Sequence, residues 1–157
     1  MEKFPITAEG YAKMEAELKH LKSVERPAVI AAISEARAHG DLSENAEYAA
    51  AKEKQSFIEG RINELEDKVS RVDVIDVKSL KGDTIKFGAT VTLVDDDSGD
   101  EATYQIVGDY EADISRKQLS LLAPLSRALI GKKAGDSIEV NTPKGTKSYE
   151  VLKIVYK

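Results

Sequence analysis

The sequence predicts an α+β protein in which a long antiparallel α-helical hairpin, packed as a coiled coil, precedes a small β-rich α+β domain. Apolar residues recur at helical spacing before Asp76 and with a period of two after it. Charge changes at the same point: residues 1–76 hold 11 basic and 16 acidic side chains, a net charge of −5, whereas residues 77–157 hold 12 of each. We therefore expect a hairpin domain over residues 1–76 and a second domain over residues 77–157.

The first arm of the hairpin is expected to begin at Thr7, which can cap a helix that has Glu9 in its opening turn. Its apolar seam has heptad-like spacing and consists of Tyr11, Met14, Leu18 and Leu21. Pro27 cannot donate a backbone hydrogen bond, so we expect a kink or a local break over residues 23–26. The apolar face resumes at Val29, Ile30 and Ile33, and Gly40 ends the arm in the position of a left-handed cap.

The second arm is expected over residues 42–72. Its apolar seam is the strongest periodic signal in the chain and consists of Ile58, Ile62, Leu65, Val69 and Val72. Close to the turn, the residues of both arms are small, namely Ala46, Ala49, Ala50 and Ala51 on this arm and Ala31, Ala32, Ala36 and Ala38 on the first. Small residues let helices approach closely, and roughly 30 residues per arm at about 1.5 Å each predict a slender projection of about 45 Å.

The second half of the chain reads as short strands separated by glycines and acidic turns. The expected strands cover residues 74–77, 85–94, 103–107, 137–141 and 149–156. Residues 95–100 and 143–145 have the composition of tight turns. An amphipathic segment within residues 119–131 can form a short helix across the sheet, capped by Ser126.

Composition excludes several classes of function. The chain has no cysteine and two histidines, which rules out thiolate zinc sites, disulfides and Cys-His nucleophile pairs, so any metal would need oxygen ligands. A pI near 5.2 argues against independent binding to duplex DNA. The amino terminus lacks the pattern of a secretory signal, and no apolar run is long enough to span a membrane. We expect a monomer in the cytoplasm, without membrane association.

An acidic run and a single histidine are interpreted as structural features. Asp95, Asp96, Asp97 and Asp100 lack the ligand spacing and the distal glutamate of a calcium loop, so we interpret them as a solvated hairpin turn. His39 can titrate near neutral pH, but a single histidine beside a turn usually caps or solvates the end of a helix. We assign it no role.

Asp41 and Glu44, in the turn between the two arms, admit two interpretations. An N-cap aspartate followed three residues later by glutamate resembles a capping box, and local sequence rules favour this structural role. The same spacing also places two carboxylates where both could face one Mg²⁺ ion or a water molecule. Two carboxylates alone are an incomplete magnesium site, which would be useful where a partner supplies the remaining ligands. The residues themselves leave both interpretations open.

Several motifs, in a consistent order along the whole chain, resemble the Gre family of bacterial transcript cleavage (elongation) factors. The most specific is the run from Ala36 to Tyr48, ARAHGDLSENAEY. The others are Leu21 to Pro27, Glu59 to Ile62, Val74 to Val77, Phe87 to Val91 and Ile106 to Gly108. The resemblance implies a helical hairpin followed by an FKBP-like domain.

The resemblance also implies a function and a partner, bacterial RNA polymerase. In this family the hairpin enters the secondary channel of a backtracked polymerase and stimulates cleavage of the nascent RNA 3′ end. The tip acids, matched here by Asp41 and Glu44, help to bind a Mg²⁺ ion in the polymerase active centre and orient the attacking water. The protein is then not an enzyme itself, and it binds no cofactor on its own.

Further residues match family positions. Arg37 and Lys52 resemble contacts to the extruded RNA, a role suited to phosphate attraction, although both also fit a solvated helix face. Asn45 and Tyr48 belong to the tip signature and are expected to orient the acids or pack the turn. The segment expected to dock on the polymerase at the channel rim contains Pro124, Leu125, Arg127 and Leu129, and it follows Ala123 where several relatives have serine.

Two other classes of function compete with this one. An FKBP-like domain suggests a prolyl isomerase, but this half of the chain is poor in aromatic residues and has no tryptophan for the floor of a pocket. A coiled-coil adaptor or an inhibitory channel-binding paralogue would use Asp41 and Glu44 only to cap a helix or block the channel. The Asp-x-x-Glu tip favours the cleavage factor.

Overall fold

The computed structural model describes residues 3–40 and 45–157. Its contacts divide the chain into two compact units. One unit joins the first ten residues to Val72–Lys157, and the other is Tyr11–Arg71. The boundary between the two units therefore follows Arg71, slightly before the boundary expected after Asp76. It lies earlier because a strand near the N-terminus pairs with the strand that follows the hairpin, which places both strands in the same unit.

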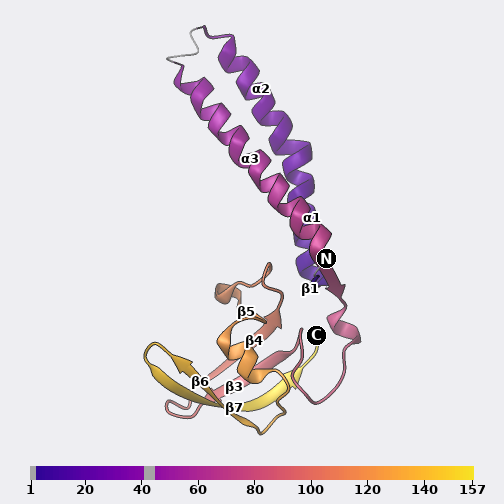
Figure 1. Cartoon of the computed structure of the whole chain (residues 1–157), viewed down its shortest axis with the longest axis vertical. Coiled ribbons are helices and arrows are strands. Elements are labelled where there is room, and N and C mark those ends of the chain that lie inside the picture. Colours follow the sequence, from indigo (N-terminus) through magenta and orange to yellow (C-terminus); the bar gives the residue numbers. More distant parts are fainter. Residues whose placement is uncertain (1–2, 41–44) are drawn as a thin grey trace. The chain divides into compact units, whose positions relative to one another are not determined.

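The hairpin consists of two antiparallel helical arms, as expected from the sequence (Figure 1). The first arm comprises α1 (Ala8–His20), a π-helix (Leu21–Glu25) and α2 (Arg26–Arg37), and the second is α3 (Ala46–Arg71). Thr7 caps α1 as predicted, since its hydroxyl accepts a hydrogen bond of 3.0 Å from the Gly10 N–H. The expected start of the second arm at Leu42 lies outside the described residues.

The break predicted before Pro27 is the π-helix. Its wider turn is closed by a hydrogen bond from the Arg26 N–H to the Leu21 carbonyl, five residues earlier. The spacing of buried residues explains why one extra residue is accommodated there: Met14 to Leu21 and Val29 to Ala36 are seven residues apart, but Leu21 to Val29 are eight. A heptad seam with one added residue stays on the same face only if one turn widens.

The seam of the hairpin is formed largely by the predicted residues. Ile58, Ile62 and Leu65 are each at most 3% exposed. Of the alanines near the turn, Ala36 and Ala51 are buried and the others are exposed. The packing close to the tip therefore relies on two small side chains. Val72, the last residue of the predicted seam, belongs to a strand instead.

Ion pairs join the two arms along their length. Arg26 makes two hydrogen bonds to Glu59, at 2.8 and 2.7 Å, and Arg61 makes two to Glu17, at 2.6 and 2.9 Å. Hydrogen bonding from Arg61 holds the pKa of Glu17 below its ordinary value, and the same contact raises the pKa of Arg61. Because planar guanidinium groups bind carboxylates in a fixed geometry, these pairs help to set the register of the arms.

The unit that joins the first ten residues to Val72–Lys157 contains two sheets. β1 (Phe4–Thr7) pairs in parallel with β2 (Val72–Ile75). The larger sheet has the order β5-β4-β3-β7-β6, in which β4 and β5 are parallel and the other neighbours are antiparallel. Its strands are β3 (Thr90–Asp95), β4 (Glu101–Val107), β5 (Gln118–Ser120), β6 (Ser137–Thr142) and β7 (Gly145–Val155).

One face of the larger sheet carries the core, against which α4 (Pro124–Leu129) packs. The core residues are Ile85, Ala89, Val91, Leu93, Ile106, Leu129, Ile138, Val140 and Val151. The helix was expected here, but its predicted cap was wrong. Ser126 lies inside α4 with a fully buried hydroxyl that has no hydrogen-bond partner among the described residues, and Ala123 occupies the N-cap position.

The segment of β1 and the start of α1 is fastened to the larger sheet by Glu111. One carboxylate oxygen accepts hydrogen bonds from the N–H groups of Thr7, at 2.8 Å, and Gly108, at 2.9 Å, and the other accepts one from the Thr7 hydroxyl. Gly10 leaves room for this carboxylate, because a Cβ atom there would lie 2.3 Å from the Glu111 Oε1 atom. No local sequence pattern indicates this contact, because Thr7 and Glu111 are 104 positions apart.

Candidate functional site at the hairpin tip

The tip is the segment between the last turn of α2 and the first turn of α3. Asp41 and Glu44, the candidate catalytic and metal-binding residues, lie outside the described residues. On the α2 side, the chain turns through Gly40, whose φ of 111° suits a residue without a side chain. The left-handed turn expected at Gly40 is thus present.

Asn45 begins the second arm and links it to the first. Its Oδ1 atom accepts a hydrogen bond of 3.0 Å from the Tyr48 N–H, which caps the N-terminus of α3. Its Nδ2 group donates a hydrogen bond of 2.7 Å to the carbonyl of Ala36, in the last turn of α2. The N-cap of α3 is therefore Asn45, so the capping that sequence rules attributed to Asp41 is provided, for this helix, by another residue.

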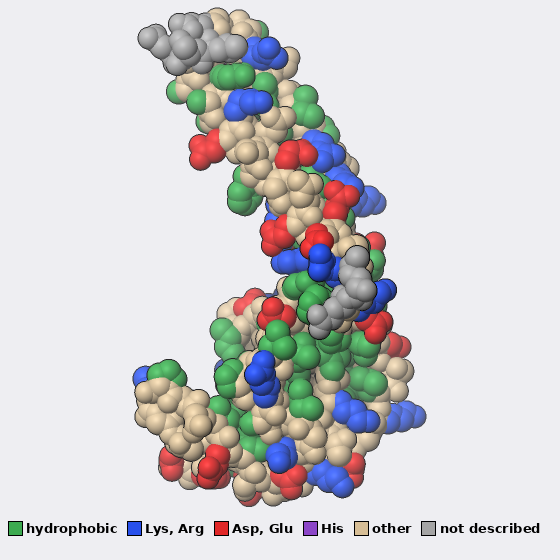
Figure 2. Space-filling view, in the orientation of Figure 1, with side chains coloured by type: hydrophobic (Ala, Val, Ile, Leu, Met, Phe, Trp, Pro, Cys, Tyr) green, Lys and Arg blue, Asp and Glu red, His purple; other side chains and the backbone are tan. Residues whose placement is uncertain are grey.

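The remaining tip residues occupy the two helix ends. Tyr48 is half-buried in the first turn of α3. Arg37, the last residue of α2, is exposed, and so is Lys52, whose ammonium donates to the Gln55 side chain at 3.2 Å. Figure 2 shows Lys and Arg side chains near this end of the hairpin. The two cations proposed to contact RNA are therefore both accessible to an anionic partner.

His39 lies beside the turn, with its Nε2 atom 3.8 Å from a carboxylate oxygen of Glu47. Both side chains are largely exposed, so the contact is a weak link between the two helix ends. Within residues 3–40 and 45–157, no cluster of three or more histidine and acidic side chains could hold a metal ion. The donor chemistry of Asp41 and Glu44, carboxylate oxygen, suits Mg²⁺.

The acidic run after β3 is the expected hairpin turn, between β3 and β4. The Asp95 carboxylate accepts hydrogen bonds from the backbone N–H groups of Asp97 and Ser98 and lies 3.4 Å from the ammonium of Lys147. These contacts, the Asp97 N–H foremost, lower the pKa of Asp95. The side chain is thus used to shape the turn.

The predicted docking segment divides into exposed and buried residues. Pro124 and Arg127 are exposed on α4. Leu125 is partly buried against the core, and Leu129 is 0% exposed within it. Leu129, which matched the contact segment of the family, was therefore wrongly included in the docking surface: it lies on the buried face of α4, where its side chain is not accessible to a partner.

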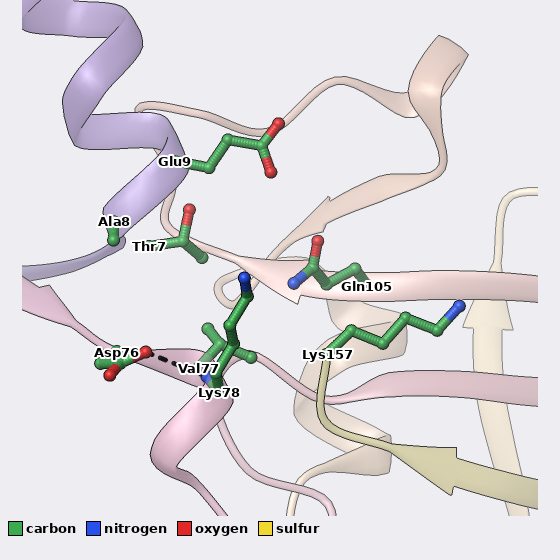
Figure 3. Close-up of a pocket in the computed structure, with 8 residues that line it drawn as sticks. All are labelled: Thr7, Ala8, Glu9, Asp76, Val77, Lys78, Gln105 and Lys157. Carbon is green, nitrogen blue, oxygen red and sulfur yellow. Dashed lines mark hydrogen bonds between the residues drawn. The ribbon is translucent and has the colours of Figure 1, made fainter.

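A cavity of about 570 Å³ lies beside the junction of β1 and α1 and had no signal in the sequence. Its polar lining includes Glu9, Asp76, Lys78, Gln105 and Lys157 (Figure 3). The Asp76 carboxylate has a structural role, because it caps a short helical turn by accepting a hydrogen bond of 3.1 Å from the Lys78 N–H. Because carboxylates and ammonium groups line the same space, its charge favours no class of ligand.

None of the described helices combines the length and the apolar character that crossing a bilayer requires.

Family models match both parts of the chain. The N-terminal model of transcription elongation factors matches residues 4–74, and the C-terminal GreA/GreB model matches residues 80–156. The hairpin and the sheet domain together therefore define a transcription elongation factor. The chain belongs to the GreA/GreB family.

Individual relatives agree with this assignment. The transcription elongation factor GreA of Rickettsia conorii is 65% identical over 155 residues, which cover 99% of this chain and 96% of that protein. GreA of Hyphomonas neptunium is 64% identical over 157 residues, the full length of both chains. Among solved structures, the GreA factor homolog 1 (Gfh1) of Thermus thermophilus is 28% identical, covering 98% of this chain and 99% of that one, with a TM-score of 0.45.

Proposed function

We propose that this protein rescues backtracked bacterial RNA polymerase by stimulating the polymerase to cleave its own transcript. The hairpin enters the secondary channel, and the turn at its end reaches the active centre. The observation that carries the proposal is the position of the Asp-x-x-Glu segment in a member of the GreA/GreB family: in the sequence it lies between α2 and α3, the two helices that form the arms of the hairpin.

The geometry of the hairpin supports this use. α3 has 26 residues, which at about 1.5 Å each extend about 39 Å. Burial of Ala36 and Ala51 leaves little side-chain bulk between the arms near the tip. A long arm with a thin end suits entry into a narrow channel.

The chemistry of the tip supports a shared active centre. Asp41 and Glu44 would supply carboxylate oxygens, the ligands that Mg²⁺ prefers, and the polymerase would supply the rest of its coordination. A Mg²⁺ ion held there would lower the pKa of a bound water and would stabilise the negative charge that develops during phosphoryl transfer. The part of this chain is to hold and orient the two carboxylates, and capping by Asn45 leaves them unneeded at the N-terminus of α3.

Two further surfaces serve the same complex. Arg37 and Lys52 are exposed cations at the tip that would attract the phosphates of the extruded RNA 3′ end. Pro124 and Arg127 are exposed on α4 and would contact the polymerase at the channel rim. In this proposal the protein has no catalytic activity of its own, since the reaction takes place in the polymerase.

The test is RNA cleavage by stalled, backtracked polymerase in the presence of Mg²⁺. The intact protein should accelerate cleavage, and Asp41→Ala or Glu44→Ala should return the rate to that of polymerase alone while both variants still bind. Glu53→Ala is a matched control, because Glu53 is an exposed acid of α3. Unchanged cleavage with both tip variants would refute the proposed role of the acids, and binding with inhibition by the intact protein would favour a channel-blocking factor.

A further inference from the structure

We propose that Phe57, together with a hollow beside it at Gly60, docks against the wall of the polymerase channel, and this inference rests on the proposed function. Both residues lie on the outer face of α3, away from the seam. The residues that line the hollow form the Phe57 surface: Ser56, Phe57, Gly60, Arg61 and Glu64, around a volume of about 510 Å³.

Phe57 is the most exposed of the large apolar side chains in the part of the chain that the structure describes. It is 74% exposed, whereas the next residue, Ile58 of the seam, is 3% exposed. The ring therefore contributes little to the packing of the two arms. A single exposed apolar residue is common on protein surfaces and alone indicates no function. Phe57 differs because a glycine lies beside it, in the next turn of the helix.

Gly60 occupies a position at which the hairpin itself does not need glycine. It lies inside α3 and lacks the positive φ that favours this residue. A Cβ atom placed there would have no neighbour within 4 Å outside the backbone of its own helix. Glycine inside a helix is destabilising relative to alanine. The hairpin thus loses stability at this position, and the result is open space beside the Phe57 ring.

The far side of the hollow is held in place by ion pairs. Arg61 donates two hydrogen bonds to Glu17, at 2.6 and 2.9 Å, and its Nη1 atom lies 3.2 Å from a carboxylate oxygen of Glu64. The other carboxylate oxygen of Glu64 lies 3.0 Å from the ammonium of Lys68. The hollow is therefore formed before a partner arrives, which lowers the cost of binding.

The size and the place of the Phe57 surface identify its occupant. A stable interface takes about 20–30 residues from each partner, so these five residues alone would hold neither a second copy of this chain nor a free peptide. They are suited to anchor a larger interface. Phe57 lies eleven residues after Ala46, the first residue of α3, a distance of about 17 Å along the helix. If the tip of the hairpin reaches the active centre, Phe57 lies inside the channel, whose wall supplies the rest of the interface.

The Kd for purified polymerase, measured by competition with labelled intact protein, tests this docking role. Phe57→Ala should raise the Kd about tenfold, as the loss of a buried aromatic anchor does, and Phe57→Leu should retain most of the affinity. The melting midpoint of both variants should stay within about 2 °C of the intact protein, because the ring is exposed. Ile30→Ala is the matched control, since Ile30 is a 52% exposed apolar side chain on the other arm.

Gly60→Gln separates docking from folding. Glutamine is a good helix former, so the melting midpoint should rise by about 2 °C. Its side chain would fill the hollow, so the Kd should rise about tenfold, as for loss of an anchor. A substitution that stabilises the hairpin and weakens its binding cannot act through damage to the fold.

Three results would overturn the inference. One is a Kd for Phe57→Ala within twofold of the intact protein or no higher than that of Ile30→Ala. Another is Gly60→Gln binding as tightly as the intact protein. The third is sedimentation in which the intact protein forms dimers that Phe57→Ala abolishes, because the occupant would then be a second copy of the chain.

The same experiments distinguish this inference from the proposed function. If the intact protein accelerates cleavage and the variants at Phe57 and Gly60 bind normally, only the docking role fails. If the intact protein binds polymerase without accelerating cleavage, the proposed function fails, and the Kd values of the variants still decide whether Phe57 docks.

Discussion

Glu111 should make a large contribution to the stability of the sheet unit. Its carboxylate accepts three hydrogen bonds, from the Thr7 N–H, the Thr7 hydroxyl and the Gly108 N–H, and both partner residues are buried. Glu111→Ala leaves these donors without a partner. Each unsatisfied buried donor costs about 1 kcal/mol or more, so the free energy of unfolding should fall by about 3 kcal/mol.

Urea unfolding followed by tyrosine fluorescence measures this loss, because four of the six tyrosines lie after residue 76. With a denaturant slope of about 1.5 kcal/mol per molar, the midpoint should fall by about 2 M. Glu111→Gln should lose much less, since its amide oxygen can accept both backbone N–H bonds from the Oε2 position and its NH₂ group can donate to the Thr7 hydroxyl.

Glu139→Ala is the matched control, because Glu139 is an exposed acid on β6. Suppose that the free energies of unfolding of Glu111→Ala and of this control differ by no more than about 0.5 kcal/mol, a margin typical of neutral surface substitutions. In that case the assigned hydrogen bonds do not stabilise the unit. A glutamine variant as unstable as the alanine variant would instead show that charge, rather than hydrogen bonding, provides the stabilisation.

Two further predictions concern a buried hydroxyl and an ion pair. Ser126→Ala should raise the free energy of unfolding by about 1 kcal/mol, because it removes a buried hydroxyl without a described partner, and urea unfolding showing destabilisation would contradict this. Since Arg61 lowers the pKa of Glu17 from its ordinary 4.5, the pair should stabilise the hairpin at neutral pH and lose this effect as the pH falls through the lowered pKa. Glu17→Gln should therefore reduce the acid sensitivity of the hairpin in thermal melts, by no more than about 1 kcal/mol because the pair is partly exposed, whereas Glu53→Gln should leave it unchanged.

Long periodic elements could be predicted from the sequence because burial repeats along them. The seam of α3 is an example, since each buried residue reinforces the same helical period. The break before Pro27 was also predictable, although its form as a π-helix depends on the added residue between Leu21 and Val29. The strand expected over residues 85–94 begins instead at Thr90, because Gly88 turns the chain with a φ of 88°.

Short elements and single contacts could not be predicted in this way. β1 and β5 have four and three residues, too few for a period to be recognised, and β1 contains Pro5. The contacts of Glu111 depend on residues far apart in the sequence, for which no local pattern exists. The Asn45 cap, in contrast, had a local signal: asparagine three residues before Tyr48 is a typical N-cap, but the acids beside it offered a competing cap.

The central claim is that the tip acids help to hold a Mg²⁺ ion in the polymerase active centre. The most direct test is the Mg²⁺ concentration needed for half-maximal RNA cleavage by backtracked polymerase, measured with saturating intact protein and with saturating Asp41→Asn, which keeps the size of the side chain and removes its charge. We predict that the intact protein lowers the required Mg²⁺ concentration well below that of polymerase alone and that the variant, although bound, does not. An equal Mg²⁺ requirement with the intact protein and the variant would contradict the account.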